Sequence, residues 1–392
     1  MRKNWNWTLF ACFTSAVTQA IICNFAPLLF LTFQRSFGIS LAQLSLLVIL
    51  NFSTQLVTDL LATFFVDKLG YRPCITAAHF LSTLGLLGLA FLPALMGAPF
   101  WGLLIPTILY AIGGGLIEVL ASPIVESCPT ENKAGVMSLL HSFYCWGHMG
   151  VVLLSALFFL TCGIENWRIL AVLWAIIPLA NGFLFLNVPI ADQPPAEKSG
   201  GIAALLRKPL FWSFLLLMFA GGATEQAISQ WVSAFAESGL HMSKAIGDLL
   251  GPCLFAGCMG LARLLFAGGQ EKLLRKRLAG GAVLCLITYI VAAFSPIPLL
   301  SLVACALTGF GVGLFWPGTC TLAAHALPGS TALFALLALA GDIGCTSGPA
   351  LLGFVADANG GDLRAGIAVG ILFPICLIVG LILTKKLKKK LA

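Results

Sequence analysis

The stretch Val66-Asp67-Lys68-Leu69-Gly70-Tyr71-Arg72-Pro73 is a short charged loop between two long apolar runs. The runs cover about 41–66 and 73–95, and each is long enough to cross a bilayer as a helix, which needs ~20 residues. The same arrangement, an apolar run followed by a short polar gap, recurs along the whole chain. It predicts an α-helical membrane protein that crosses the bilayer many times.

Twelve apolar runs of this kind predict twelve transmembrane helices. They lie at about 5–33, 41–66, 73–95, 99–128, 134–161, 168–188, 209–236, 244–268, 277–295, 298–326, 331–356 and 364–385. Together they occupy most of the 392 residues, so no soluble domain fits between them. The first run follows Arg2 and Lys3 without a small-residue cleavage site, and we expect it to be a membrane helix rather than a removed signal peptide.

The composition supports the same class. Apolar residues make up 59% of the chain and charged residues only 9%, and the mean hydropathy is +0.99. A soluble domain normally has about a quarter of its residues charged. The composition therefore excludes a water-soluble protein.

The basic residues predict the orientation. Of 22 Lys and Arg, 17 fall in alternate gaps or tails on one side of the predicted membrane, including the C-terminal lysines of 385–390. Because cytoplasmic loops carry the excess of Lys and Arg, we expect both termini to be cytoplasmic in a cell membrane. This distribution also accounts for the net charge of +7 without a nucleic-acid partner.

The cysteine pattern predicts neither a metal site nor a cofactor. The chain has 13 cysteines, an odd number, without a C-x-x-C pair or a His/Cys cluster at metal-ligand spacing. Most of them fall within the predicted spans, where we interpret them as small apolar residues. Besides a substrate, we therefore expect only H⁺ or Na⁺ as a coupling ion.

The chain is predicted to have two halves. A Pro/Gly/Ser-rich polar stretch at 189–208 is typical of a cytoplasmic linker, and it separates a six-helix half, 1–188, from a second, 209–392. Gly113-Gly-Gly-Leu-Ile-Glu118 and Gly311-Val-Gly-Leu-Phe-Trp316 occupy equivalent places, 198 residues apart. Two six-helix halves repeated in parallel are expected to hold a substrate site between them, near mid-membrane.

The loop 66–73 resembles the D-[RK]-x-G-x-[RK] loop of the major facilitator superfamily. A degenerate second copy begins at Gly260-Leu-Ala-Arg263 and continues through Glu271-Lys-Leu-Leu-Arg-Lys-Arg277. The resemblance implies a twelve-helix transporter, usually a monomer. It also implies that Asp67, Arg72 and Arg263 form a gate on the cytoplasmic side.

A second resemblance is more specific. The segments Gly113-Gly-Gly-Leu-Ile-Glu118 to Glu126 and Ser138-Leu-Leu-His141-Ser-Phe resemble the fourth and fifth helices of the fucose permease-like sugar:cation symporters, and Glu225-Gln-Ala-Ile-Ser-Gln-Trp231 resembles their seventh. This implies that Glu118 is linked to protons and that His141 lines the sugar cavity. The first span, with Cys23-Asn24-Phe25, lacks the acid of the N-D pair that fucose permeases have there.

Three acids within the predicted spans are candidates for cation or proton coupling: Glu118, Glu225 and Asp342. A carboxylate inside a membrane costs a few kcal/mol, so such residues are functional hypotheses by default. The alternative for each is a structural hydrogen bond to a neighbouring helix, and it is as good an account as function for Asp342, which has glycines nearby.

Candidate substrate ligands lie at similar depths in several spans. They are Asn24, Gln55, His141, Tyr144, His148, Gln226, Gln230, Trp231 and Trp316. Amides suit sugar hydroxyls and indole rings suit the apolar faces of a pyranose, although each histidine and tryptophan has helix packing as its alternative role. Lys and Arg are absent from the middle of every span, which disfavours an anionic substrate.

We therefore expect a transporter that takes up a neutral, sugar-like small molecule, driven by H⁺ or Na⁺. The first alternative is an exporter that exchanges drugs or lipophilic cations for protons. Against it, the fifth span reads His148-Met-Gly-Val-Val-Leu-Leu-Ser, without the G-x(3)-G-P-x(2)-G-G bend of such exporters. The second alternative is a membrane sensor or an intramembrane enzyme. The sequence shows no nucleophile motif, metal cluster or output domain that would favour it.

Overall fold

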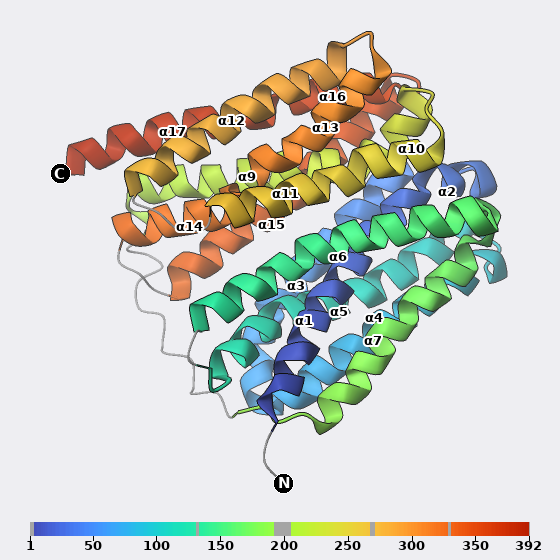
Figure 1. Cartoon of the computed structure of the whole chain (residues 1–392), viewed down its shortest axis with the longest axis horizontal. Helices are drawn as coiled ribbons and strands as arrows, with labels where there is room; N and C mark the ends of the chain where they lie inside the picture. Colours follow the sequence, from blue (N-terminus) through green and yellow to red (C-terminus); the bar gives the residue numbers. More distant parts are fainter. Residues whose placement is uncertain (1–3, 131–132, 192–204, 267–270, 328–330, 392) are drawn as a thin grey trace. The chain divides into compact units, whose positions relative to one another are not determined.

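Long apolar runs satisfy their backbone hydrogen bonds internally only as helices, and the described part of the chain is helical throughout. The computed structural model describes residues 4–130, 133–191, 205–266, 271–327 and 331–391 (Figure 1). Local signals set several helix ends. Ser40 and Gln43 form a capping box at the start of one helix, and Gly38, with φ 66°, ends the helix before it.

The chain divides into two compact units, Met1–Pro195 and Ala196–Ala392. The predicted linker 189–208 falls mostly outside the described residues, so the boundaries 1–188, 189–208 and 209–392 stay predictions. Unit 1 contains α1 (Trp5–Asn24), η1 (Ala26–Leu29), α2 (Phe30–Phe37), α3 (Leu41–Leu69), α4 (Tyr71–Leu95), α5 (Pro99–Ser127), α6 (Lys133–Cys162), η2 (Ile164–Asn166) and α7 (Trp167–Asn187).

Unit 2 contains several spans that are divided into shorter helices. Its elements are α9 (Pro209–Ala234), η3 (Phe235–Gly239), α10 (Lys244–Asp248), η4 (Leu249–Cys253), α11 (Leu254–Phe266), α12 (Glu271–Phe294), α13 (Pro298–Val312), α14 (Phe315–Ala326), α15 (Thr331–Ala358), α16 (Leu363–Gly370) and α17 (Leu372–Leu391). The segments η3 and η4 are π-helical.

Each unit uses the same helix pairings. In unit 1, α1 packs against α5, α6 and α7, α4 packs against α5 and α7, and α3 packs against α5. In unit 2, α9 packs against α13, α14, α15 and α17, α12 packs against α13, α16 and α17, and α11 packs against α13. The second set repeats the first when α13 with α14 is matched to α5, and α16 with α17 to α7, which confirms the predicted architecture of two six-helix repeats.

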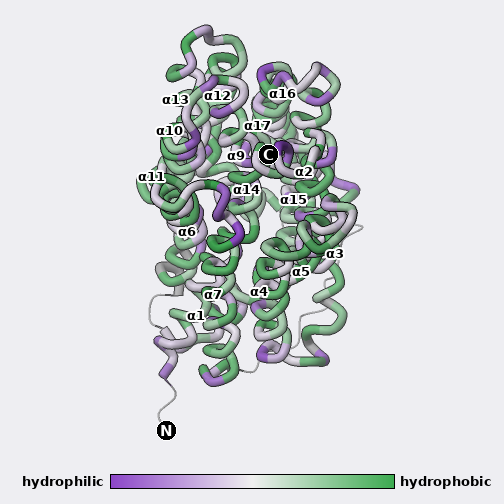
Figure 2. Tube along the Cα trace, turned by 90° about the vertical axis from the view of Figure 1, so that its right-hand side faces the viewer, coloured by the Kyte–Doolittle hydropathy of each residue, from purple (hydrophilic) through white to green (hydrophobic). Residues whose placement is uncertain are grey.

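Eleven helical segments in the described residues are long and apolar enough to cross a membrane. The one predicted span outside these eleven, 209–236, corresponds to α9. The second half of α9 contains Thr224, Glu225, Gln226, Ser229 and Gln230. These polar residues lower its hydropathy, although α9 is long enough to cross. Hydrophobic residues colour most of the helical tube, and hydrophilic residues gather mainly near helix ends (Figure 2).

Glycines allow α9 and α15 to pack closely. A Cβ atom at Gly344 would collide with the carbonyl oxygen of Phe219, and one at Gly348 would lie 2.6 Å from the carbonyl oxygen of Ala223. Both obstacles are backbone atoms of α9, which cannot move aside as a flexible side chain can. The glycines therefore set the distance between these two helices.

Gly344→Ala is expected to destabilise the protein by about 1–3 kcal/mol, because the added methyl overpacks the contact between α9 and α15. Thermal unfolding in detergent measures the effect. Gly150→Ala is the matched control, since a Cβ atom at Gly150 in α6 would have nothing within 4 Å. Alanine also favours the helix by ~1 kcal/mol there. Equal stability of the two variants would contradict the close-packing account.

Candidate substrate and coupling site

A cluster of amides joins α1 and α3 in unit 1. Gln19 Nε2 donates to Gln55 Oε1 at 2.6 Å, and Gln55 Nε2 donates to Asn51 Oδ1 at 3.0 Å. Gln55 also lies 3.8 Å from Cys23 Sγ. A side chain at Gly114 of α5 would collide with both glutamines, so the small residue there makes room for the cluster. The predicted ligand Gln55 thus lies in a polar group that includes Gln19.

Asn24 extends this polar region toward α6. Its Nδ2 donates to Ala20 O at 2.9 Å and lies 3.5 Å from Tyr144 Oη. Its Oδ1 is buried and, like Gln19 Oε1, accepts no hydrogen bond from the described residues. Buried polar atoms are nearly always hydrogen-bonded, so two amide oxygens in one region without a donor indicate a place for water or a ligand donor.

The predicted face of α6 becomes more buried along its length. His141 is exposed, Tyr144 is half-buried and His148 is 2% exposed. The rings of Tyr144 and His148 lie 6.5 Å apart between centroids. The structure therefore brings Asn24 and Tyr144 together and places His148 within the packed interior, where helix packing accounts for it.

Glu118 is exposed on α5, although it falls within a membrane span. Gly113, Gly114 and Gly115 are all buried, and the two outer glycines let α5 approach the backbones of α4 and α3. Glu118 follows Gly114 by four residues, one turn of helix, and so lies on the same side of α5 as the glycine that borders the amide cluster.

Unit 2 contains a polar group along α9. Glu225 is half-buried and accepts a 3.3 Å hydrogen bond from Gln226 Nε2, while Gln230 Nε2 donates to Gln226 Oε1 at 3.2 Å. Arg263 of α11 is close enough to Glu225 to interact with it electrostatically. Arg263 lies near the end of its own span, so this interaction is compatible with the absence of Lys and Arg from the middle of the spans.

The other predicted residues of unit 2 have different surroundings. Trp231 is 1% exposed and donates from Nε1 to Pro349 O at 2.8 Å, so it serves as packing between α9 and α15. Trp316 is half-buried, and its ring lies against Gly341 of α15. Asp342, the next residue, is also half-buried. Trp316 and Asp342 therefore lie near each other, while Trp231 is better explained by structure than by binding.

The structure describes the side-chain contacts of two of the three predicted gate residues, Arg72 and Arg263. The side chain of Asp67 lies outside the described part. Arg72 donates to the carbonyl oxygens of Phe185 and Leu186 at 2.7 and 2.9 Å and to that of Val188 at 2.8 Å. It thereby caps the end of α7 within its own unit. Arg263 Nε donates to Gly313 O at 3.2 Å. A latch made by these three residues stays a prediction.

A buried polar cluster in unit 1 was not predicted. Asn181 Nδ2 lies 2.8 Å from His79 Nε2 and 3.3 Å from Ser15 Oγ, and His79 Nδ1 lies 2.8 Å from Ile75 O. His79 is 0% exposed, and the cluster joins α1, α4 and α7. The bond to a backbone carbonyl makes Nδ1 the protonated nitrogen and leaves Nε2 as the acceptor. Sequence spacing could not indicate contacts across such distances along the chain.

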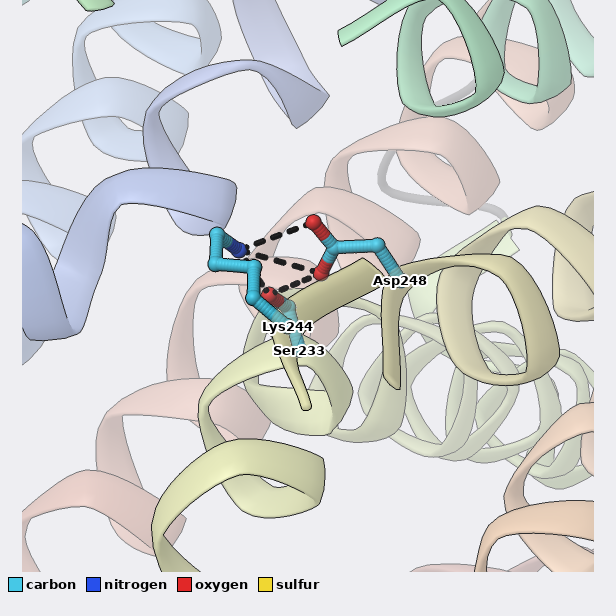
Figure 3. A network of polar contacts seen from close by, with 3 residues as sticks. All are labelled: Ser233, Lys244 and Asp248. Atoms are coloured by element: carbon cyan, nitrogen blue, oxygen red, sulfur yellow. Dashed lines mark hydrogen bonds and ion pairs between the residues drawn. The ribbon is translucent and has the colours of Figure 1, made fainter. Parts of the chain in front are cut away.

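A second unpredicted network lies between α9 and α10 in unit 2. Lys244 Nζ is 2.8 Å from Asp248 Oδ2 and 3.0 Å from Ser233 Oγ, and Ser233 Oγ also donates to Asp248 Oδ1 at 2.5 Å (Figure 3). Asp248 is 0% exposed. Lys244 and Asp248 are four residues apart, so the buried partner lies one turn along the same helix.

Metal ligands do not cluster in the described residues, where groups of three or more His, Cys, Asp or Glu side chains near one another are absent. The cysteines are free thiols, and most of them are buried. The chemistry that the site offers is therefore hydrogen bonding by amides and binding of a cation by carboxylates.

Comparison with known proteins identifies the family. A Major Facilitator Superfamily profile matches residues 8–277. The multi-drug resistance efflux pump PmrA homolog of Lactococcus lactis subsp. lactis (strain IL1403) is 24% identical over 377 residues, which cover 90% of this chain and 90% of that protein.

Solved structures show the same fold at low identity. An inward-facing, unoccupied bacterial homolog of the human lysosomal transporter Spinster has a TM-score of 0.76 at 15% identity, covering 99% of this chain and 98% of its own. The Escherichia coli fucose:proton symporter FucP has a TM-score of 0.66 at 18% identity, covering 97% and 98%. With the profile match over most of the chain, the conclusion is that this protein belongs to the Major Facilitator Superfamily, whose members are membrane transporters and not enzymes.

Proposed function

We propose that this transporter takes up a neutral, sugar-like small molecule together with H⁺ or Na⁺. The observation that carries the proposal is the pair of buried amide oxygens, Gln19 Oε1 and Asn24 Oδ1, that lack donors in unit 1. Hydroxyl groups of a ligand would supply those donors and would in turn accept from the neighbouring amide and phenol groups. In unit 2, the half-buried Trp316 and the amides of α9 are the remaining candidate ligands.

Glu118 is the proposed coupling residue. It is an exposed carboxyl group within a membrane span, on the helix that also borders the amide cluster. Alternating access would bring Glu118 to each side of the membrane in turn, so that it loads and releases the cation with the substrate. Glu225 and Asp342 are the second candidates, and Arg263 beside Glu225 favours a structural ion pair for that residue.

The proposed setting is a cell membrane, with both termini in the cytoplasm and the protein acting as a monomer. The support is the distribution of basic residues. Basic residues are concentrated at the helix ends near Lys68, Lys208, Lys276 and Lys386, and the positive-inside rule assigns this side to the cytoplasm. Arg168 lies in a gap on the other side.

Export of drugs or lipophilic cations is the second candidate. It is favoured by the sequence similarity to the multi-drug resistance efflux pump homolog, which extends over nearly the whole chain. An exposed carboxylate such as Glu118 suits an organic cation as well as it suits a proton. A thermal-shift screen of hexoses, pentoses and glycosides against lipophilic cations distinguishes the two. Stabilisation by cations alone would make export the better account.

His141→Ala is expected to weaken binding of a stabilising sugar by about 1–3 kcal/mol, because it removes a polar partner from the proposed cavity. Calorimetry with the sugar found in the screen measures the loss. His325→Ala is the matched control, since His325 is also an exposed histidine but lies near the end of α14. Equal losses in both variants would remove His141 from the site.

A further inference from the structure

One end of unit 2 gathers basic residues from three helices. Arg207 and Lys208 precede α9, Lys276 lies in the first turns of α12, and α17 ends in a lysine-rich segment. In α17 the helix continues without a break from apolar residues into Lys385, Lys386, Lys388 and Lys389. These charges lie close together if the ends of the three helices are at the same level.

Contacts between α9 and α17 fix their register. Gly380 lies against Leu217, and Thr384 Oγ1 donates to Ser213 Oγ at 3.0 Å. Between these two contacts α17 advances by four residues, from 380 to 384, while α9 goes back by four, from 217 to 213. The two helices are therefore antiparallel. One further step brings Lys388 level with Pro209, where α9 begins. Lys385 and Lys386 then lie level with the first turn of α9.

The same reasoning places the start of α12 at this level. Gly370 lies against Tyr289 of α12. Gly370 ends α16 just before α17, and α12 packs against both helices, so α12 runs back toward its start as α17 runs on from Leu372. At about 1.5 Å per residue, this brings Thr384 to about the level of the first turns of α12. Lys276 lies in these turns. The basic residues of α9, α12 and α17 therefore form one cluster, which we call the basic end and define as Arg207, Lys208, Lys276, Lys385, Lys386, Lys388 and Lys389.

The surroundings add to the positive charge. Arg207, Lys276, Lys385, Lys386 and Lys389 are exposed. In the sequence of these three helix ends, Glu271 is the one acid, and its side chain lies outside the described part. The N-termini of α9 and α12 contribute their positive helix-dipole ends at the same level.

An exposed tryptophan places this cluster at the membrane surface. Trp212, in the first turn of α9, is 56% exposed, and its Nε1 donates to Leu206 O at 2.8 Å. Tryptophans with an apolar face outward and the N–H satisfied are typical of the headgroup level of a bilayer. The lysines of α17 are level with Trp212 or slightly beyond it, and can thus reach lipid phosphates.

We propose that the basic end is a binding surface for anionic lipid headgroups.

The test is lipid retention by the full-length purified protein, equilibrated in mixed micelles of phosphatidylglycerol and phosphatidylcholine and measured by mass spectrometry. The variant replaces Lys385, Lys386, Lys388 and Lys389 by glutamine. A lysine near an anionic surface contributes about fivefold, which corresponds to about 1 kcal/mol. Preference for phosphatidylglycerol is expected to fall at least ~10-fold in this variant, and to weaken in the wild type as salt is raised.

Two controls separate charge from folding. Replacing the same four lysines by arginine is expected to keep the preference, because the charges remain. Arg168→Gln removes an exposed charge that is not part of the basic end, and it is expected to leave the preference for phosphatidylglycerol unchanged. Melting temperatures in phosphatidylcholine alone report whether each variant is folded. Unchanged lipid preference in a folded glutamine variant would overturn the proposal and favour an acidic protein as the partner of this surface.

Discussion

Replacement of Glu118 by glutamine is expected to reduce the accumulation of substrate to the level of its outside concentration, while exchange of substrate across the membrane persists. Glutamine keeps the size and hydrogen bonding of the side chain but cannot take up a proton or balance a cation. Loss of coupling therefore removes the driving force without removing binding. Uptake and exchange of a labelled substrate in proteoliposomes measure the two activities separately.

Glu126→Gln is the matched control for this experiment. Glu126 is also an exposed glutamate on α5, eight residues further along, near the end of the helix. We expect it to keep accumulation. If Glu118→Gln still concentrates the substrate, the coupling residue lies elsewhere, and Asp342→Asn becomes the next variant to test.

The second large effect is expected on stability. Lys244→Met leaves the carboxylate of Asp248, whose side chain is 1% exposed, buried without its cation. Removal of one partner of a buried ion pair typically costs about 3–5 kcal/mol. Thermal unfolding in detergent should therefore begin at a clearly lower temperature than in the wild type.

The double variant Lys244→Met with Asp248→Leu separates the unpaired charge from other causes. It removes the carboxylate as well, so most of the lost stability is expected to return. A double variant that is as unstable as Lys244→Met would show that the lysine stabilises the protein in another way. The turn nearby includes His241 in the left-handed region, with φ 54°, and is the alternative origin of such an effect.

The spans could be predicted from sequence because apolar length is a local property. Even α9, whose polar residues from Thr224 onward lower its hydropathy, was recognised from its apolar first half and its neighbours. The repeat predicted two six-helix halves, and the matching helix pairings of the two units agree with it. Asn51 and Gln55 are four residues apart, a spacing that places two side chains on one face of a helix, and a 3.0 Å hydrogen bond joins them.

Contacts between helices could not be predicted in the same way. Asn181 meets His79 across 102 residues, and Ser233 meets Asp248 across a turn that contains a π-helical segment. Each partner alone has the pattern of an ordinary polar residue in a span. The contacts of Arg72 with the end of α7 were not predicted either, and its role in a gate stays a prediction. The roles of Glu118, Glu225 and Asp342 in coupling stay predictions.

The most direct test of the proposed transport is movement of cations and substrate in one preparation. De-energised cells that produce the protein receive the sugar selected by the thermal-shift screen, while external pH and uptake of labelled sugar are followed with and without Na⁺. We predict sugar uptake accompanied by alkalinisation of the medium, or dependent on Na⁺. In Glu118→Gln, downhill sugar uptake should persist without the pH change or the Na⁺ dependence. Extrusion of a lipophilic cation from energised cells, without movement of any sugar, would contradict the account.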